Sequence, residues 1–115
     1  AEPEGAALLS GEEWSPHKIQ GWTPDFVPAV LNKDVADKII IVNDDEAIAN
    51  AKRLAKEEGI FVGISAGGTL TAALTMAETA PDNSTFCIML ADTGERYLSS
   101  PLFADITEES DEEKL

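Results

Sequence analysis

The chain has 115 residues and a formal net charge of −14, with 43% hydrophobic and 26% charged residues. This composition is that of a globular chain, because so many apolar residues can bury enough surface to fold. The negative charge argues against a nucleic-acid binder, which needs a basic face, and against docking on an anionic membrane. No apolar run approaches the roughly 20 residues of a membrane span, and a single cysteine fits a reducing compartment. We therefore expect a soluble, cytoplasmic chain.

The predicted elements begin with an extended or looped entry over residues 1–25 and a short helical turn at Phe26–Leu31. Lys38–Val42 is a β-branched run bounded by polar residues, which predicts a buried strand. A helix follows, because Asn43 can cap it, acids fill its first turn and Gly59 can end it.

The same alternation continues in the second half of the chain. Ile60–Ile64 is another short apolar run, and an apolar helical period then extends from Ser65 to Thr79. Thr85–Ala91 predicts another buried strand, whereas Asp105–Leu115 carries six acids in eleven residues and predicts a solvated tail. Strands that alternate with helices predict an α/β fold in which parallel strands are flanked by helices.

Taken one at a time, the polar residues leave their roles open. Ser65 stands where a strand meets a helix, a frequent ligand position, but taken alone it is better explained as the helix N-cap. His17 is the only histidine and lacks a nucleophile nearby in sequence, which favours a local polar contact over catalysis. We expect Gly94–Tyr97 to brace the structure, with Glu95 and Arg96 paired. Cys87 has no basic neighbour and is expected to be buried and inert.

Three segments are far more specific together: Pro16-His-Lys-Ile-Gln-Gly21, Gly63-Ile-Ser-Ala-Gly-Gly68 and Asp92-Thr-Gly-Glu-Arg-Tyr-Leu-Ser99. Their order and spacing resemble the C-terminal third of cysteine synthase (O-acetylserine sulfhydrylase). That enzyme uses pyridoxal 5'-phosphate (PLP) and has the fold-type II, or tryptophan synthase β-like, fold. The resemblance implies that residues 1–104 are the C-terminal part of the larger, cofactor-binding domain, and that 105–115 form an acidic tail.

The resemblance also implies residues that face PLP. Ser65 matches the serine that faces the pyridine nitrogen, where a neutral hydroxyl does not hold the nitrogen protonated as a carboxylate would. Asp92 and Thr93 match the segment that passes the edge of the ring. These three residues are the cofactor-binding candidates.

Two further sites follow from the first segment. Gly21 and Trp22 match the loop that borders the substrate entrance, but Trp22 and the proline after it make this loop bulkier than in many cysteine synthases. His17 and Lys18 match the surface that receives the C-terminal tail of serine acetyltransferase, although Glu13 replaces a basic residue often found before that histidine.

The family's Schiff-base lysine, phosphate loop and substrate-carboxylate loop precede the part represented here, and none of the lysines matches that motif. We therefore expect no catalytic residue in this chain, and we expect the chain to be inactive without the upstream N-terminal part of the same enzyme. The complete enzyme is expected to form a homodimer. The complete enzyme is expected to make L-cysteine from O-acetyl-L-serine and sulfide by β-replacement. The alternatives are a cystathionine β-synthase-like or O-phosphoserine-using enzyme, or a non-catalytic module that binds partner proteins. No cluster has metal-ligand spacing.

Overall fold

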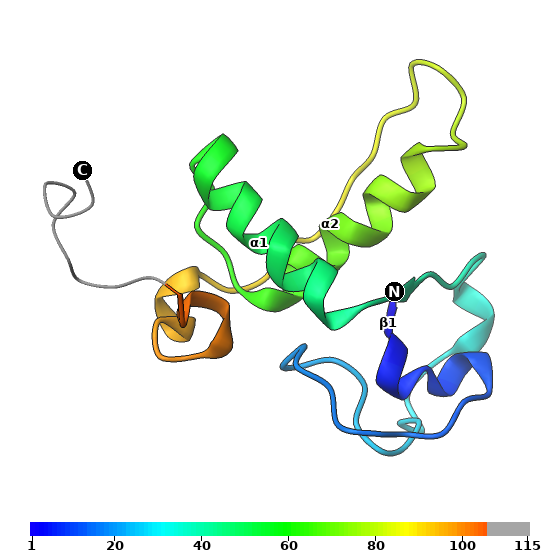
Figure 1. Ribbon diagram of the computed structural model, residues 1–115. Helices are drawn as coiled ribbons and strands as arrows, with labels where there is room; N and C mark the ends of the chain where they lie inside the picture. Colours follow the sequence, from blue (N-terminus) through cyan, green and yellow to red (C-terminus); the bar gives the residue numbers. More distant parts are fainter. Residues whose placement is uncertain (106–115) are drawn as a thin grey trace, which may run out of the picture.

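Two helices and a short parallel sheet organise the chain in the computed structural model, which describes residues 1–105 (Figure 1). Strand β1 (Glu2–Pro3) pairs in parallel with strand β2 (Ile41–Val42), and Pro3 lies opposite Val42. Helix α1 (Asp44–Glu58) follows β2 directly, and helix α2 (Ile64–Ala77) packs against α1. The parallel pairing beside two helices is the predicted α/β arrangement.

Helix α1 begins and ends where its sequence predicts. The side chain of Asn43 accepts hydrogen bonds from the backbone N–H groups of Asp45 (2.9 Å) and Glu46 (3.3 Å), two of the donors that a helix start leaves unpaired. The Asn43 amide also donates to Glu4 (2.8 Å), which joins the cap to the entry segment. Gly59 ends the helix with a φ of 69°, a left-handed conformation that suits glycine.

The two helices approach closely because glycine and alanine meet at their contact. A Cβ built on Gly67 would lie 2.0 Å from the carbonyl oxygen of Ala47 and 2.7 Å from the backbone nitrogen of Ala51. Only a residue without a Cβ allows this separation. One buried cluster continues from this contact to the sheet and the C-terminal turns, and it contains Ile19, Val42, Ala47, Ala51, Ile64, Tyr97, Leu102 and Phe103.

The entry segment is more ordered than a plain loop. It holds β1 and two 3₁₀ turns, η1 (Glu4–Ala6) and η2 (Leu8–Ser10). The Glu2 carboxylate is buried and accepts from the Leu9 backbone N–H (2.6 Å) and the Ser10 hydroxyl (2.9 Å). A buried carboxylate needs such partners, so Glu2 fastens η2 to the sheet.

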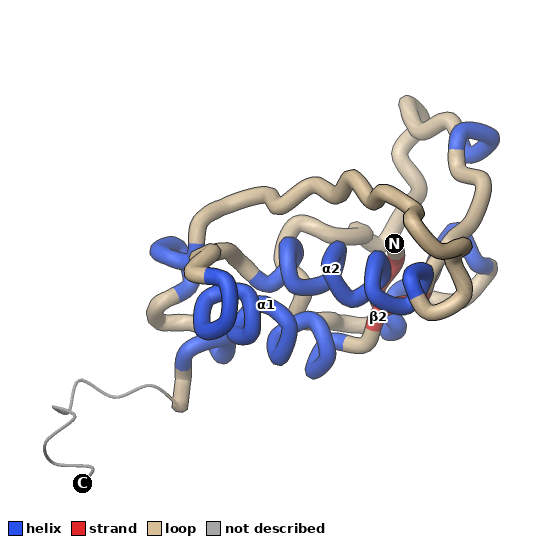
Figure 2. Tube along the Cα trace, turned by 90° about the horizontal axis from the view of Figure 1, so that it is seen from above, coloured by secondary structure: helices blue, strands red, loops and turns tan. Residues whose placement is uncertain are grey.

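Three predicted strands are wrong in extent or in existence. Of Lys38–Val42, only Ile41–Val42 forms a strand, and Ile41 is half-exposed. Residues 60–63 pair with no strand in the described part of the chain, and Ile64 already begins α2. Thr85–Ala91 also pairs with no strand among residues 1–105, although it runs along α2 (Figure 2). Apolar, β-branched composition predicts a strand, but a ladder also requires a neighbour on at least one edge.

Two local predictions also fail. Phe26–Leu31 is not helical, because Pro28 donates no N–H and disfavours the helical conformation of the residue before it. A 3₁₀ turn, η3 (Lys33–Val35), forms instead a few residues later. Cys87 is exposed, not buried, because the segment that carries it has no cover in the described chain.

The C-terminal part of the described chain consists of the 3₁₀ turns η4 (Gly94–Tyr97), which lies at the start of α2, and η5 (Pro101–Phe103), which lies beside the second half of α1 (Figure 1). The predicted acidic tail from residue 106 onward lies outside the described residues. In residues 1–105, neither helix has the length and apolarity required to span a bilayer.

Candidate functional site

Ser65 occupies the second position of α2, and its surroundings do not satisfy its hydroxyl. Gly63 is the N-cap of the helix and offers no side-chain hydrogen bond, so the interpretation of Ser65 as N-cap is wrong. Ser65 is only 8% exposed, yet its hydroxyl has no hydrogen-bond partner among residues 1–105. The oxygen of this hydroxyl is not fully buried, so at the start of the helix it is free to bond a ligand.

Asp92 and Thr93 reach this region through Tyr97. The Tyr97 hydroxyl donates to the Asp92 carboxylate over 2.8 Å, and the Tyr97 ring covers Gly63. Asp92 has a left-handed φ of 57°, which asparagine and aspartate adopt more readily than most residues. Burial raises the pKa of the Tyr97 hydroxyl, and its bond to Asp92 adds to this effect, so the hydroxyl remains a donor at neutral pH.

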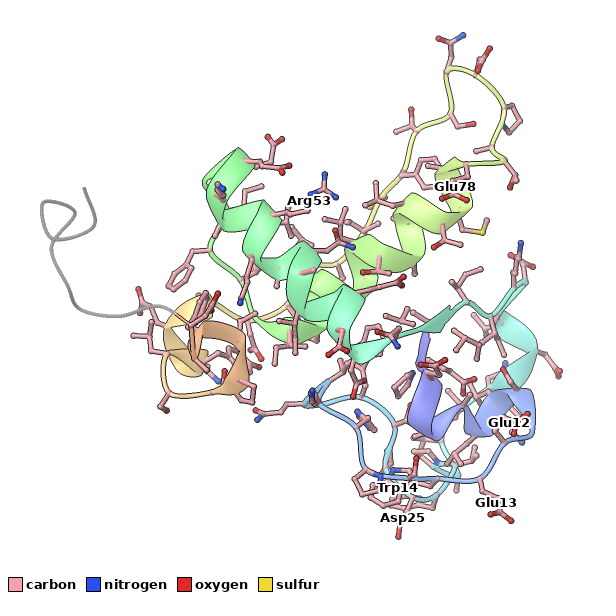
Figure 3. The ribbon with its side chains drawn as sticks, viewed as in Figure 1. Glu12, Glu13, Trp14, Asp25, Arg53 and Glu78 are labelled. Carbon is pink, nitrogen blue, oxygen red and sulfur yellow. The ribbon has the colours of Figure 1, made fainter. Side chains whose placement is uncertain are left out.

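The loop after His17 is fixed from both sides. The Nδ1 atom of His17 accepts from the Ile19 backbone N–H and its Nε2 atom lies 3.2 Å from the Thr23 carbonyl, which assigns the proton to Nε2. Trp14 also donates to the Thr23 carbonyl over 3.1 Å, and Figure 3 shows Trp14 at this loop beside Asp25. Both ring nitrogens of His17 are thus in use, as a local polar contact requires.

Trp22 brings the same loop to α2. A Cβ built on Gly68 would lie 2.8 Å from the Trp22 indole, which is half-buried against the main cluster. Gly21, with a φ of 88°, permits the turn that places the indole there. The first turns of α2 therefore lie between two aromatic rings, Tyr97 on Gly63 and Trp22 on Gly68.

Lys18 lies apart from this arrangement, at the start of α1. Its backbone N–H donates to Asp44 (2.8 Å), and its ammonium group lies 3.5 Å from the Asp45 carboxylate. Both charged groups of this ion pair are exposed, so it contributes little to stability.

The structure thus gathers some predicted site residues and separates others. Ser65, Trp22 and the Asp92–Thr93 turn border the first turns of α2, whereas His17 and Lys18 belong to the loop and to the α1 start. Glu95 and Arg96 form no ion pair within residues 1–105. Tyr97 packs in the core, and its bond to Asp92 was not predicted, since only their placement in one short turn hints at it.

Comparison with known proteins identifies the family. No protein-family model matches the chain. An O-ureido-L-serine synthase from Streptomyces lavendulae is 51% identical over 111 residues, which is 96% of this chain and 34% of that protein. A probable cysteine synthase from Bacillus subtilis is 47% identical over 91% of this chain and 34% of its own length. This chain is homologous to the C-terminal third of cysteine synthase-type enzymes.

Solved structures of the family agree with this. The crystal structure of O-ureido-L-serine synthase superposes with a TM-score of 0.92 at 50% identity, over 98% of this chain and 36% of that one. Cysteine synthase from Entamoeba histolytica gives a TM-score of 0.85 at 38% identity, over 95% of this chain and 32% of that one. The chain spans about a third of the length of these relatives and matches their C-terminal part, so the predicted PLP fold-type II class is confirmed.

The residues present fit the ring side of a PLP site. The Ser65 hydroxyl has no partner among residues 1–105 and is available to a ring nitrogen, at a helix start that lies between the rings of Tyr97 and Trp22. The described residues contain no group of three or more His, Cys, Asp or Glu side chains placed to hold a metal ion.

Proposed function

We propose that this chain forms the ring-binding part of a PLP-dependent β-replacement enzyme, and that the complete enzyme makes L-cysteine from O-acetyl-L-serine and sulfide. The single observation that carries the proposal is the accessible hydroxyl of Ser65, which has no hydrogen-bond partner among residues 1–105 and lies at the start of α2. Homology to cysteine synthases supports it.

Each named residue has a task in this proposal. PLP, when bound, withdraws electrons from the substrate's α-carbon. Ser65 bonds the pyridine nitrogen without holding it protonated, Asp92 and Thr93 border the ring's edge, and Gly21 and Trp22 border the substrate entrance. Trp22 excludes water there, because its indole covers Gly68.

The chain does not complete this site on its own. None of its lysines matches the family's Schiff-base motif, so the nucleophile that anchors PLP belongs to the upstream N-terminal part. We propose that the two parts act together in a homodimer in the cytoplasm, and that this chain alone is inactive.

A second candidate is the synthesis of O-ureido-L-serine. The relative with that name is 51% identical, against 47% for the Bacillus cysteine synthase. O-ureido-L-serine and L-cysteine differ in the atom bound to the β-carbon. An oxygen nucleophile replaces the leaving group in the first product, and sulfide replaces it in the second. The hydroxyl oxygen of hydroxyurea is the nucleophile that yields an O-ureido product.

The deciding experiment uses the complete enzyme with O-acetyl-L-serine and competing nucleophiles. Cysteine synthase predicts the highest kcat/KM with sulfide, the second candidate predicts it with hydroxyurea, and a cystathionine β-synthase-like enzyme predicts it with homocysteine. Replacing O-acetylserine by O-phosphoserine tests the remaining enzyme alternative. Absence of PLP and of turnover with every pair would contradict the proposal and favour a partner-binding module.

Ser65 variants of the complete enzyme test the assigned contact. Ser65→Ala removes one neutral hydrogen bond, so we expect a loss of about fivefold to tenfold in kcat/KM with the fold intact. Ser65→Asp is expected to protonate the ring nitrogen and change the absorption of bound PLP. Wild-type rates and spectra in both variants would refute the contact.

Docking of serine acetyltransferase at His17 and Lys18 is a separate proposal. Lys18 already pairs with Asp45, and Glu13 adds negative charge, so we expect only weak binding of that partner's acidic tail. Titration of a peptide with the tail sequence into the complete enzyme measures this, and Glu13→Arg should tighten the binding.

A further inference from the structure

We infer that Tyr97 is a positioning residue, which fixes the Asp92–Thr93 turn against the start of α2 through its hydroxyl and its ring. The inference rests on the proposed function, because it explains how that turn is held at the edge of PLP. Tyr97 is 6% exposed, so its ring is buried, while its hydroxyl makes a partly buried bond to the exposed Asp92.

Two contacts, each between an aromatic ring and a glycine, join residues 61–63 to residues 94–97. One ring belongs to the first segment and the other ring to the second. The ring of Tyr97 lies over Gly63, where an added Cβ would come within 2.4 Å of it. The ring of Phe61 lies over Gly94, where an added Cβ would come within 2.5 Å. The Gly94 N–H also donates to the Phe61 carbonyl over 3.1 Å. Each segment thus supplies one glycine and one aromatic ring, and we call this pair of contacts the clasp.

The clasp places the Tyr97 hydroxyl but does not by itself fix Asp92. Asp92 holds a left-handed φ of 57°, which costs backbone energy in a residue other than glycine. Its carboxylate accepts one hydrogen bond among residues 1–105, the 2.8 Å bond from Tyr97. Among residues 1–105 no strand pairs with the preceding segment, so this bond acts together with the Gly94–Phe61 contact to restrain the turn.

The position of the clasp connects the turn with Ser65. Gly63 is the N-cap of α2, two residues before Ser65, and the Tyr97 ring rests on it. A ring that cannot move without leaving Gly63 keeps its hydroxyl at one point, and Asp92 with it. Tyr97 thereby sets the position of the turn relative to the helix start, without touching PLP.

The test compares Tyr97→Phe with Thr71→Val in the complete enzyme. Tyr97→Phe keeps the ring over Gly63 and removes only the hydroxyl. Thr71 is equally buried, at 6% exposure, and its hydroxyl bonds to Asn50 and to the Gly67 carbonyl, on the side facing α1. We expect Tyr97→Phe to weaken PLP binding about tenfold and to change the emission of bound PLP. Thr71→Val should lower Tm and leave PLP affinity and emission unchanged.

Asp92 variants provide the second arm, and they remain informative if Tyr97→Phe does not fold, because Asp92 is exposed. Asp92→Ala should reproduce the loss of PLP affinity, Asp92→Asn should retain an acceptor and most of the affinity, and Tyr97→Phe/Asp92→Ala should be no worse than either single variant. If Tyr97→Phe or Asp92→Ala lowers Tm but leaves PLP affinity and emission unchanged, the inference is overturned and the proposed function is not. A wild-type enzyme that binds no PLP would overturn the proposed function, and the inference with it.

Discussion

Gly67→Ala tests whether the close approach of α1 and α2 depends on the missing side chain. The added Cβ would lie 2.0 Å from the Ala47 carbonyl oxygen and 2.7 Å from the Ala51 nitrogen, so the helices must separate by about 1 Å. Both obstructing atoms belong to a helix backbone and cannot rotate away. Overpacking of this kind costs typically about 1–3 kcal/mol, and the rigid backbone places this site at the upper end or above it.

The opposing term is the helix propensity of alanine, which is about 1 kcal/mol better than that of glycine. We therefore expect Gly67→Ala to lower the free energy of unfolding by a net of about 2 kcal/mol, measured by denaturant titration of the complete enzyme. Gly68→Ala is the matched control, because its Cβ meets only the outer edge of the Trp22 indole, which can shift. Equal or higher stability of Gly67→Ala would refute the reasoning, since propensity would then outweigh contact.

Three further outcomes are expected. Asn43→Ala should cost about 1–2 kcal/mol in denaturant unfolding, because it removes the α1 cap and the bond to Glu4; an unchanged midpoint would contradict this. The raised pKa of Tyr97 contributes stability that is present below its ordinary value of 10.0 and is lost as pH rises through the folded value; Tyr97→Phe should therefore flatten the alkaline limb of a stability–pH curve. The isolated chain should oligomerise or melt without a sharp transition, because it leaves Phe86 and Met89 exposed; a monomer with a cooperative melt would argue for an autonomous module. It should also show no borohydride-fixed lysine adduct with PLP, because it lacks the family's lysine motif.

Local signals in the sequence predicted local structure well. The start and end of α1 follow from Asn43, the acids after it and Gly59, because capping and termination involve residues within a few positions of one another. The strands were less predictable. The apolar run Thr85–Ala91 satisfies the composition of a strand, but pairing depends on a neighbour that composition does not reveal.

The candidate site followed from motifs, and its internal connections did not. The order of the three segments located Ser65, Trp22 and the Asp92–Thr93 turn. The bond from Tyr97 to Asp92 and the contact of Trp22 with Gly68 depend on how distant segments fold against each other. The glycines in the sequence do not predict these contacts, because turns, helix caps and close approaches between segments all use glycine.

The contact between the Trp22 indole and Gly68 has a consequence for how this protein can change over generations. A side chain at residue 68 has to displace the indole, while a smaller residue at position 22 would remove that restriction. The two positions therefore form a coupled pair, in which the tryptophan must shift for a small residue at position 68 and be replaced for a large one. A lineage that exchanges Trp22 for a small residue gains two variable positions, one in this loop and one on the adjoining helix, and the proposed function places both near the substrate entrance.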